Sequence, residues 1–179
     1  MSVKRRTARE SDLTRREAVQ LGVAVLVALA WPARSRAALA PDVAVLLERS
    51  GFVYLSPLTS DGGESRCHGE VWYGWLDGAV VLITSRTSWK ARALARGLSR
   101  ARIWVGDHGR VGRVLGSGEA FREAPSFEAR ATQSADAALL DRLMTTYRRK
   151  YPNEIESWES RMRAGFESGE RLLIRYAPL

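Results

Sequence analysis

An Asp-Gly pair at positions 77 and 78 separates two segments rich in β-branched and aromatic residues, 65–76 and 79–85. Such a pair is typical of a two-residue β-hairpin, because both turn positions need a positive φ angle that Asp and Gly tolerate. A second turn, at 61–63, separates the segment 65–76 from an earlier apolar run at 52–58. Successive hairpins of this kind produce antiparallel strands, so the sequence predicts a mainly β fold.

Apolar spacing along the rest of the chain predicts flanking helices and further strands. The expected strands are 52–58, 65–76, 79–85, 100–106, one or two between Arg110 and Glu123, and a last one at Arg171 to Tyr176. The expected helices are Pro41 to Arg49, a short basic one after Ser88, one capped by Ser134 and ended by Pro152, and one with the apolar stripe Ile155, Trp158, Met162 and Phe166. We expect that stripe to be core. The fold predicted is a β-barrel with flanking helices.

A cluster of hydroxyl and basic side chains ends the apolar run 79–83. The cluster consists of Thr84, Ser85, Arg86, Ser88, Lys90 and Arg92. A helix start offers unpaired backbone N–H groups, hydroxyls donate further hydrogen bonds, and Lys and Arg supply positive charge, so this junction can hold a phosphate. The alternative from spacing is a strand followed by an ordinary Ser or Thr cap and a solvated basic helix.

The segment from Phe52 to Val105 resembles the flavin-binding split barrel of the pyridoxamine phosphate oxidase-like superfamily. The order and spacing of FVYLSPL, ESRCHGEVWYGWLDG, AVVLITS, SWKARALARG and RARIWVG carry the resemblance. It implies a split β-barrel of the FMN-binding type over 41–179. It also implies a homodimer, since in this family the cofactor lies between two subunits.

The resemblance further implies which residues hold the cofactor phosphate. By position these are Thr84, Ser85, Ser88 and Lys90. Trp89 stands where the family usually has an arginine. Either Arg86 or Arg92 would then supply the missing charge, or Trp89 would pack on the cofactor. The chain ends in ESGERLLIRYAPL and has no substrate motif for vitamin B6.

The function expected from the resemblance is a flavin-binding oxidoreductase acting on a small molecule, with FMN or a deazaflavin coenzyme as cofactor. The catalytic residues are unknown. The first alternative is a non-catalytic protein on the same barrel that binds haem or another small ligand. The second is a barrel without a cofactor that serves as an interaction module, an alternative that the tryptophan at position 89 keeps open.

Residues 1–40 have the pattern of an export signal. Arg15 and Arg16 precede an uncharged run from Leu21 to Trp31, which resembles a twin-arginine signal and is too short to cross a bilayer as a helix. Small residues before Ala37 and Ala40 suit cleavage after either one. We therefore expect the protein to be exported, to periplasmic or other extracytoplasmic space, with no other membrane association.

The leader also accounts for most of the positive charge. The chain has 28 Lys and Arg against 20 Asp and Glu, a net charge of +8, and residues 1–40 hold eight and three of these. Residues 41–179 therefore carry 20 and 17, a net charge of +3, which argues against a nucleic-acid partner. About 140 residues make one domain of ordinary size.

Sequence motifs for metal binding or nucleophilic catalysis do not stand out. Cys67, the single cysteine, cannot form an intrachain disulfide, and we expect it and His68 to point to opposite faces of one strand. His108 lies far away in the sequence, so no metal site is expected.

Aromatic residues that could flank a flavin ring, or could equally belong to the core, are Trp72, Tyr73, Trp75 and Trp104. We expect the acidic residues Glu154, Glu156 and Glu159 to form a solvated helix face.

Overall fold

A computed structural model of the protein describes residues 39–106 and 120–179. Its helices are α1 (Pro41–Arg49), α2 (Trp89–Ala95), the 3-10 helix η1 (Ala120–Glu123), α4 (Ala137–Lys150), α5 (Pro152–Ile155) and α6 (Glu159–Glu167). Its strands are β1 (Phe52–Pro57), β2 (Gly69–Trp72), β3 (Gly74–Leu76), β4 (Ala79–Ser85), β5 (Arg100–Val105), β6 (Ser126–Ser134) and β7 (Arg171–Pro178). The predicted export signal lies outside the described residues, except for its last two positions.

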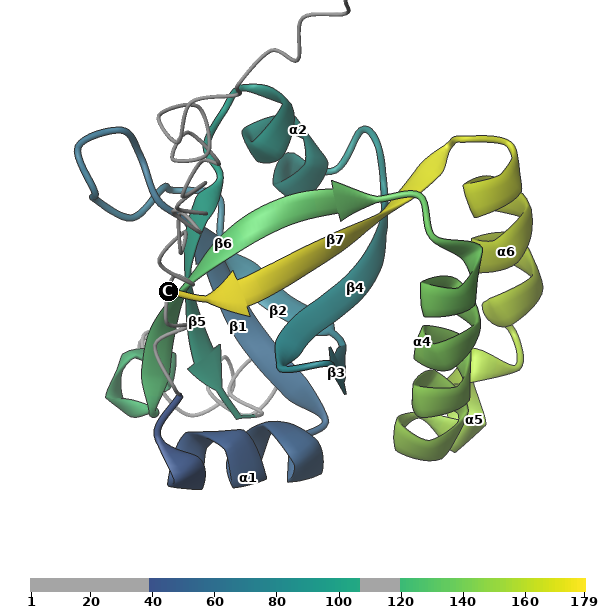
Figure 1. Cartoon of the computed structure of the whole chain (residues 1–179), viewed down its shortest axis with the longest axis horizontal. Helices are drawn as coiled ribbons and strands as arrows, with labels where there is room; N and C mark the ends of the chain where they lie inside the picture. Colours follow the sequence, from purple (N-terminus) through teal and green to yellow (C-terminus); the bar gives the residue numbers. More distant parts are fainter. Residues whose placement is uncertain (1–38, 107–119) are drawn as a thin grey trace, which may run out of the picture. The chain divides into compact units, whose positions relative to one another are not determined.

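These strands form one antiparallel sheet in the order β2-β1-β5-β6-β7-β4-β3. β2 and β3 stand at opposite ends of this order, yet only Tyr73 separates them in the chain. Because consecutive Cα atoms are about 3.8 Å apart, the two ends of the sheet must meet at Tyr73. The sheet is therefore curled into a nearly closed barrel (Figure 1). The split β-barrel with flanking helices that the sequence predicts is confirmed.

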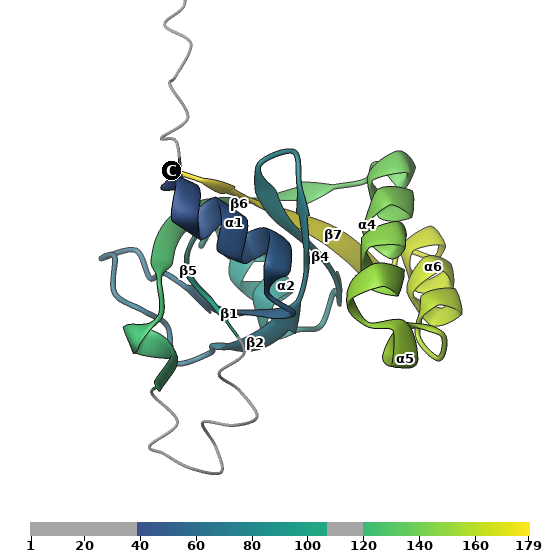
Figure 2. The same cartoon turned by 90° about the horizontal axis from the view of Figure 1, so that it is seen from below.

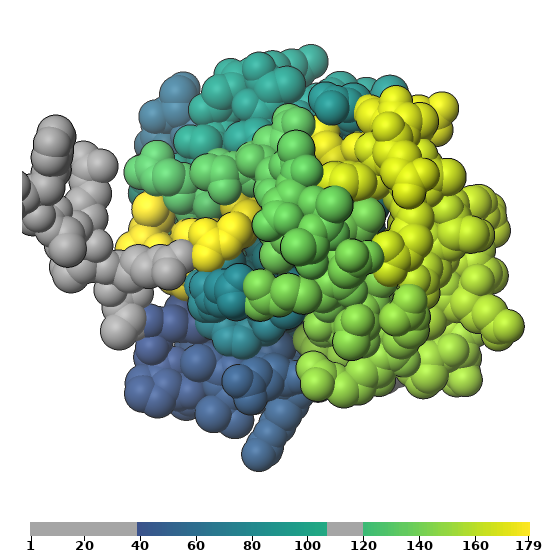
Figure 3. All heavy atoms as spheres, turned by 45° about the vertical axis from the view of Figure 1, so that its right-hand side comes forward, coloured from purple at the N-terminus to yellow at the C-terminus, as the bar shows by residue number. Residues whose placement is uncertain are grey.

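Strands β4 and β7 are buried on both faces. Their inward side chains join the core of the barrel, and their outward side chains join a second core under α4, α5 and α6. The inward residues are Val80, Leu82, Leu172 and Ile174, and the outward ones are Val81, Ile83 and Leu173. Figure 3 shows the three helices packed together over this side of the barrel. Continuous apolar runs such as AVVLI are expected when both faces of a strand are covered.

Two short helices lie at opposite ends of the barrel, α1 at one end and α2 at the other (Figures 1 and 2). Val43 and Leu47 of α1 belong to the barrel core, and so does Ala91 of α2. The hydroxyl of Tyr73 donates a hydrogen bond to the Leu47 carbonyl oxygen over 2.6 Å. The α1 end is therefore closed by apolar packing and by a buried hydroxyl.

The strand predicted over 65–76 is shorter and is interrupted. It begins at Gly69 and breaks at Tyr73 into β2 and β3, which join opposite ends of the sheet. The cause is a contact far away in sequence: the Tyr73 N–H donates to the hydroxyl of Tyr151, 78 residues later, over 3.0 Å. Cys67 and His68 consequently lie before the strand. Cys67 is exposed, and His68 Nδ1 is 2.9 Å from the Tyr54 hydroxyl.

The predicted cap at Ser134 is wrong. Ser134 is the last residue of β6 and pairs with Leu173 of β7. The helix α4 is capped by Asp136, whose Oδ1 accepts hydrogen bonds from the N–H groups of Ala138 (2.8 Å) and Leu139 (3.2 Å). The β6–β7 pairing therefore includes Ser134, and the helix cap is Asp136, two residues after the one that capping preference predicts.

Two other sequence expectations concern the segments on either side of α4. The strands predicted between Arg110 and Glu123 fall largely on residues 107–119, outside the described residues, as does His108, and residues 120–123 form η1 rather than a strand. In the predicted apolar stripe, Ile155 and Met162 are buried, whereas Trp158 is 40% exposed. Trp158 lies at the turn between α5 and α6, where the chain leaves the core.

Candidate functional site: a cavity at the open edge of the barrel

The barrel is open along one half of β4. β3 pairs only with the first three residues of this strand, Ala79 to Val81. From Leu82 to Ser85, β4 pairs with β7 on one side and with no strand of the described residues on its other side. This gap between the two ends of the sheet is the split in the barrel.

A cavity of about 460 Å³ occupies this gap, within the size range of small-molecule sites. Its walls come from β2, β4, α2, the three helices α4 to α6, and the start of β7. The lining residues are Glu70, Val71, Trp72, Leu82, Ile83, Thr84, Lys90, Tyr147, Glu154, Trp158, Met162 and Arg171. The cavity therefore joins the inner face of the barrel to the layer of helices.

Lys90 is the most informative residue in the cavity wall. It is partly buried, and its Nζ lies 4.5 Å from the centroid of the Trp89 ring. Among the described residues, Nζ has no hydrogen-bond acceptor and no carboxylate partner. Burial lowers the pKa of Lys90 below its ordinary value, because the charged form loses hydration. A cation in this position favours the arrival of an external anion.

Two hydroxyls beside Lys90 are already arranged by the protein. Thr84, at the end of β4, is buried and donates from Oγ1 to Ser88 Oγ over 3.0 Å. Ser88 Oγ also accepts from the Ala91 N–H over 3.3 Å and so caps α2. A hydroxyl that accepts two hydrogen bonds still has its own proton to donate. Thr84 and Ser88 thus form a hydrogen-bonded polar pair, and Thr84 lines the same cavity as Lys90.

The other three residues predicted for the phosphate site point elsewhere. Ser85 Oγ lies 2.9 Å from the Thr87 hydroxyl, and Arg86 donates from Nε to the Gly169 carbonyl oxygen. Arg92 is exposed on α2. Ser85, Arg86 and Arg92 do not line the cavity. Of the six predicted residues, Thr84 and Lys90 line the cavity, and Ser88 is joined to Thr84 by a hydrogen bond without lining it.

Trp89 has a structural role at this end of the barrel. It is partly buried and packs against the barrel core. A Cβ at Gly69 of β2 would lie 3.9 Å from its Cζ2 atom, so the indole approaches the end of that strand. Trp89 is not among the residues that line the cavity. Its contacts are with the core and with the Lys90 ammonium.

Arg171 is a site residue that the sequence reasoning missed. It is the first residue of β7, is partly buried, and lines the cavity together with Thr84 and Lys90. The sequence predicts only that Arg171 begins a strand. Arg171 is 81 residues from Lys90, so no local pattern links the two, and the one clue in the sequence is that a charged residue precedes the apolar run LLI.

The cavity lining also carries the acidic residues Glu70 and Glu154. Burial raises the pKa of the nearby Tyr151 hydroxyl, and these two carboxylates raise it further. Of the predicted acidic helix face, Glu159 instead pairs with Arg148 and Arg163. The cavity lining therefore combines the basic residues Lys90 and Arg171 with the acidic residues Glu70 and Glu154.

Of the four aromatic candidates, Trp72 alone lines this cavity. Its ring stacks on Tyr151, with centroids 4.4 Å apart and planes 9° from parallel. Tyr73 is buried in the barrel core, and Trp75 packs against that core. Trp104 is buried next to Phe121. A flat ligand in the cavity would meet the edge or face of Trp72.

The described residues contain no group of three His, Cys, Asp or Glu side chains placed to hold a metal ion. In the same two ranges, no helix combines the length and the apolar composition that a membrane span requires.

Comparison with known proteins supports the fold. No protein-family model matches the sequence, and no curated protein matches it. The conserved hypothetical protein Rv2991 from Mycobacterium tuberculosis is similar in structure, with a TM-score of 0.52 and 18% identity over 81% of this chain and 84% of that protein. HutZ, the heme storage protein from Vibrio cholerae, has a TM-score of 0.50 and 14% identity over 79% of this chain and 90% of its own.

A third similar structure is ChuZ from Campylobacter jejuni, with a TM-score of 0.51 and 8% identity over 76% of this chain. The match spans about half of ChuZ, 51% of its chain. At these identities the likeness is one of fold.

Proposed function

We propose that the protein binds FMN, or a related deazaflavin coenzyme, in the cavity at the open edge of β4 and acts as an oxidoreductase on a small molecule. The observation that carries the proposal is the partly buried Lys90 ammonium, which faces the cavity without an anionic partner among the described residues. The sequence resemblance to flavin-binding split barrels supplies the identity of the anion.

The residues present fit a phosphate ester. A phosphate carries nearly two negative charges at neutral pH and accepts several hydrogen bonds. Lys90 offers the charge, and Ser88, whose Oγ accepts from Thr84 and from the Ala91 N–H, keeps its own hydroxyl proton to donate. Trp72 lines the same cavity and presents an aromatic surface to a flat ring system.

The cofactor would supply the redox chemistry, and the protein would bind and orient it. Lys90 and the hydroxyl pair would hold the phosphate end. The apolar walls Val71, Leu82 and Ile83 would exclude water from the rest of the ligand. The acidic residues Glu70 and Glu154 would favour neutral or cationic groups of a second molecule.

Two parts of the proposal rest on the sequence alone. The family resemblance supports a homodimer with the cofactor between subunits. The twin-arginine pattern at Arg15 and Arg16 supports export of the mature chain after cleavage near Ala37 or Ala40. Export in the folded state would suit a protein that receives its cofactor in the cytoplasm.

Titration of the cofactor-free protein with FMN, followed by flavin fluorescence, tests the proposal. Lys90→Met keeps the apolar stem and removes the charge, so we expect it to weaken FMN binding by about ten- to a hundredfold. Arg92→Met is the matched control, since it removes one positive charge from an exposed position on the same helix. Equal affinities of wild type and Lys90→Met would contradict the phosphate site.

Haem is the alternative ligand, and the similarity to HutZ, named as a heme storage protein, supports testing it. Absorption spectra after adding haem or FMN to the same protein separate the two. A Soret band with no flavin binding would replace the flavin proposal. His68 would then be the first candidate for a haem ligand among the described residues, and it lies beside Tyr54, away from the cavity.

A further inference from the structure

We propose that Arg171 supplies the second positive charge for the ligand phosphate and so replaces the arginine that the family usually has at the position of Trp89. This inference rests on the proposed function and specifies which residues of the same cavity recognise the phosphate. Neither Arg86 nor Arg92, the two arginines close to Lys90 in sequence, lines the cavity, whereas Arg171 does.

The first observation is that Arg171 has no partner among the described residues. Four arginines of the described residues are partly buried, at positions 102, 163, 171 and 175. Arg102 pairs with Glu128 at 2.9 Å, Arg163 pairs with Glu159 at 2.9 Å, and Arg175 donates to the Asp77 carbonyl oxygen at 3.0 Å. Within the described ranges, Arg171 has neither a hydrogen-bond acceptor nor an ion pair for its guanidinium group. Partial burial without a partner is costly unless a ligand supplies one.

The second observation is that α6 is shaped to receive the Arg171 side chain. A Cβ at Gly165 would lie 2.8 Å from Arg171 Cδ and 2.9 Å from its Cγ, closer than real contacts allow. Gly165 is buried in the last turn of α6, within the helix, where glycine costs about 1 kcal/mol relative to alanine. The absence of a Cβ there lets the stem of Arg171 pack against the backbone of α6.

The third observation is the register between β7 and β4. Arg171 pairs with Ser85, and the next residue of β7, Leu172, pairs with Thr84. Arg171 therefore starts at the same end of β4 as Thr84 but faces the layer of helices, whereas Thr84 and Leu172 face the inside of the barrel. The cavity at the open edge of β4 is lined by residues of both faces. Lys90 enters the cavity from α2 and Arg171 from β7, so the two positive charges reach it from different elements.

The test compares FMN with riboflavin, which lacks the phosphate. Arg171→Met retains an apolar stem over Gly165 and removes the guanidinium group. We expect about tenfold weaker FMN binding, unchanged riboflavin binding, and a weaker dependence of FMN affinity on salt concentration. Arg86→Met is the matched control, since Arg86 is exposed and bonded to Gly169, and it should leave all three quantities unchanged.

Gly165→Ala provides a second variant that keeps the arginine and moves it. Here Gly165 acts as a positioning residue, so the added methyl group should also lower the preference for FMN over riboflavin. Arg171→Met decides the matter if Gly165→Ala does not fold.

Each outcome bears on one of the two proposals. Arg171→Met with wild-type FMN affinity and wild-type salt dependence would overturn this inference and leave the flavin proposal intact. Equal losses of FMN and riboflavin affinity would assign Arg171 to the ring instead of the phosphate and would overturn it as well. If the wild-type protein binds neither flavin, the proposed function and this inference both fail.

Discussion

Each end of the barrel has a partly buried lysine, and the two lysines differ in the hydrogen-bond acceptors around the ammonium group. At the α1 end, Lys150 donates from Nζ to the carbonyl oxygens of Leu47 (3.2 Å) and Ser50 (2.8 Å) and lies 3.7 Å from the centroid of the Tyr73 ring. At the α2 end, Lys90 also lies against an aromatic ring, but no acceptor among the described residues meets its ammonium group.

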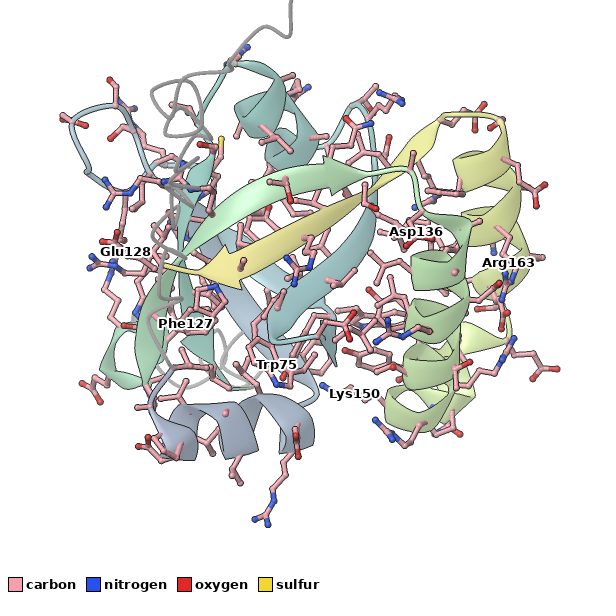
Figure 4. The ribbon with its side chains drawn as sticks, viewed as in Figure 1. Trp75, Phe127, Glu128, Asp136, Lys150 and Arg163 are labelled. Carbon is pink, nitrogen blue, oxygen red and sulfur yellow. The ribbon has the colours of Figure 1, made fainter. Side chains whose placement is uncertain are left out.

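Burial lowers the pKa of both groups, that of Lys150 to about 8. Figure 4 shows Lys150 pointing from the end of α4 toward the end of the barrel that α1 covers, with Trp75 nearby. Burial alone therefore does not distinguish a lysine that binds a ligand from a structural one. The two lysines differ in whether the protein supplies hydrogen-bond acceptors for the ammonium group.

The largest expected effect is a difference in the free energy of unfolding between variants of the two lysines. Lys150→Met removes the charged donor from the Leu47 and Ser50 carbonyl groups, which keep the Tyr73 hydroxyl as a donor, so we expect a loss of about 1.5 kcal/mol in the free energy of unfolding, with FMN affinity unchanged. Lys90→Met should lose FMN affinity at unchanged or slightly raised stability, since it removes an unpaired, desolvated charge. Chemical denaturation of both variants measures this. If Lys90→Met were the more destabilised of the two, the comparison would be wrong.

A smaller effect is expected at the start of α4, far from either lysine. Asp136→Ala removes the side chain that accepts from two helix N–H groups and should cost about 1 kcal/mol, with FMN affinity unchanged. Ser134→Ala should cost only a few tenths of that, because Ser134 Oγ accepts a single exposed bond from the Asp136 N–H. Thermal unfolding of the two variants ranks them. A larger loss in Ser134→Ala would restore the cap to the position that the sequence indicated.

The smallest effect is the pH dependence of Lys150. Its pKa is about 8 in the folded protein and near the ordinary 10.5 in the unfolded chain, so the unfolded chain binds more protons between these values. This group's contribution to stability is therefore lost as pH falls through 8 and recovered as pH rises toward 10.5. Since the ammonium is partly exposed, we expect a change below about 1 kcal/mol between pH 7 and 9.5.

The measurement is the difference in unfolding free energy between wild type and Lys150→Met across that range. Buried Tyr73, Tyr147, Tyr151 and Tyr176 have raised pKa values and act in the opposite direction above pH 10, so the range stops below it. A difference that stays constant from pH 7 to 9.5 would show that Lys150 has an ordinary pKa.

The sequence by itself determined the parts of the fold that depend on neighbouring residues. The Asp77-Gly78 hairpin is one, because both residues adopt the positive φ angles, 50° and 66°, that this turn requires. The helix Pro41–Arg49 and the strand Ala79–Ser85 lie where the apolar spacing predicted them. Thr84 and Lys90 line the cavity for a similar reason, since they are six residues apart across one strand-to-helix junction.

Other features of the fold and of the cavity depend on contacts between residues that are distant in the sequence. The break at Tyr73 depends on the hydroxyl of Tyr151, and the position of Arg171 depends on a missing Cβ at Gly165 and on pairing with Ser85. These contacts join segments between six and 86 residues apart, so no local pattern records them. Local preferences act through backbone angles and neighbouring side chains. The partners of a buried charge are set by which distant strands and helices the barrel brings together.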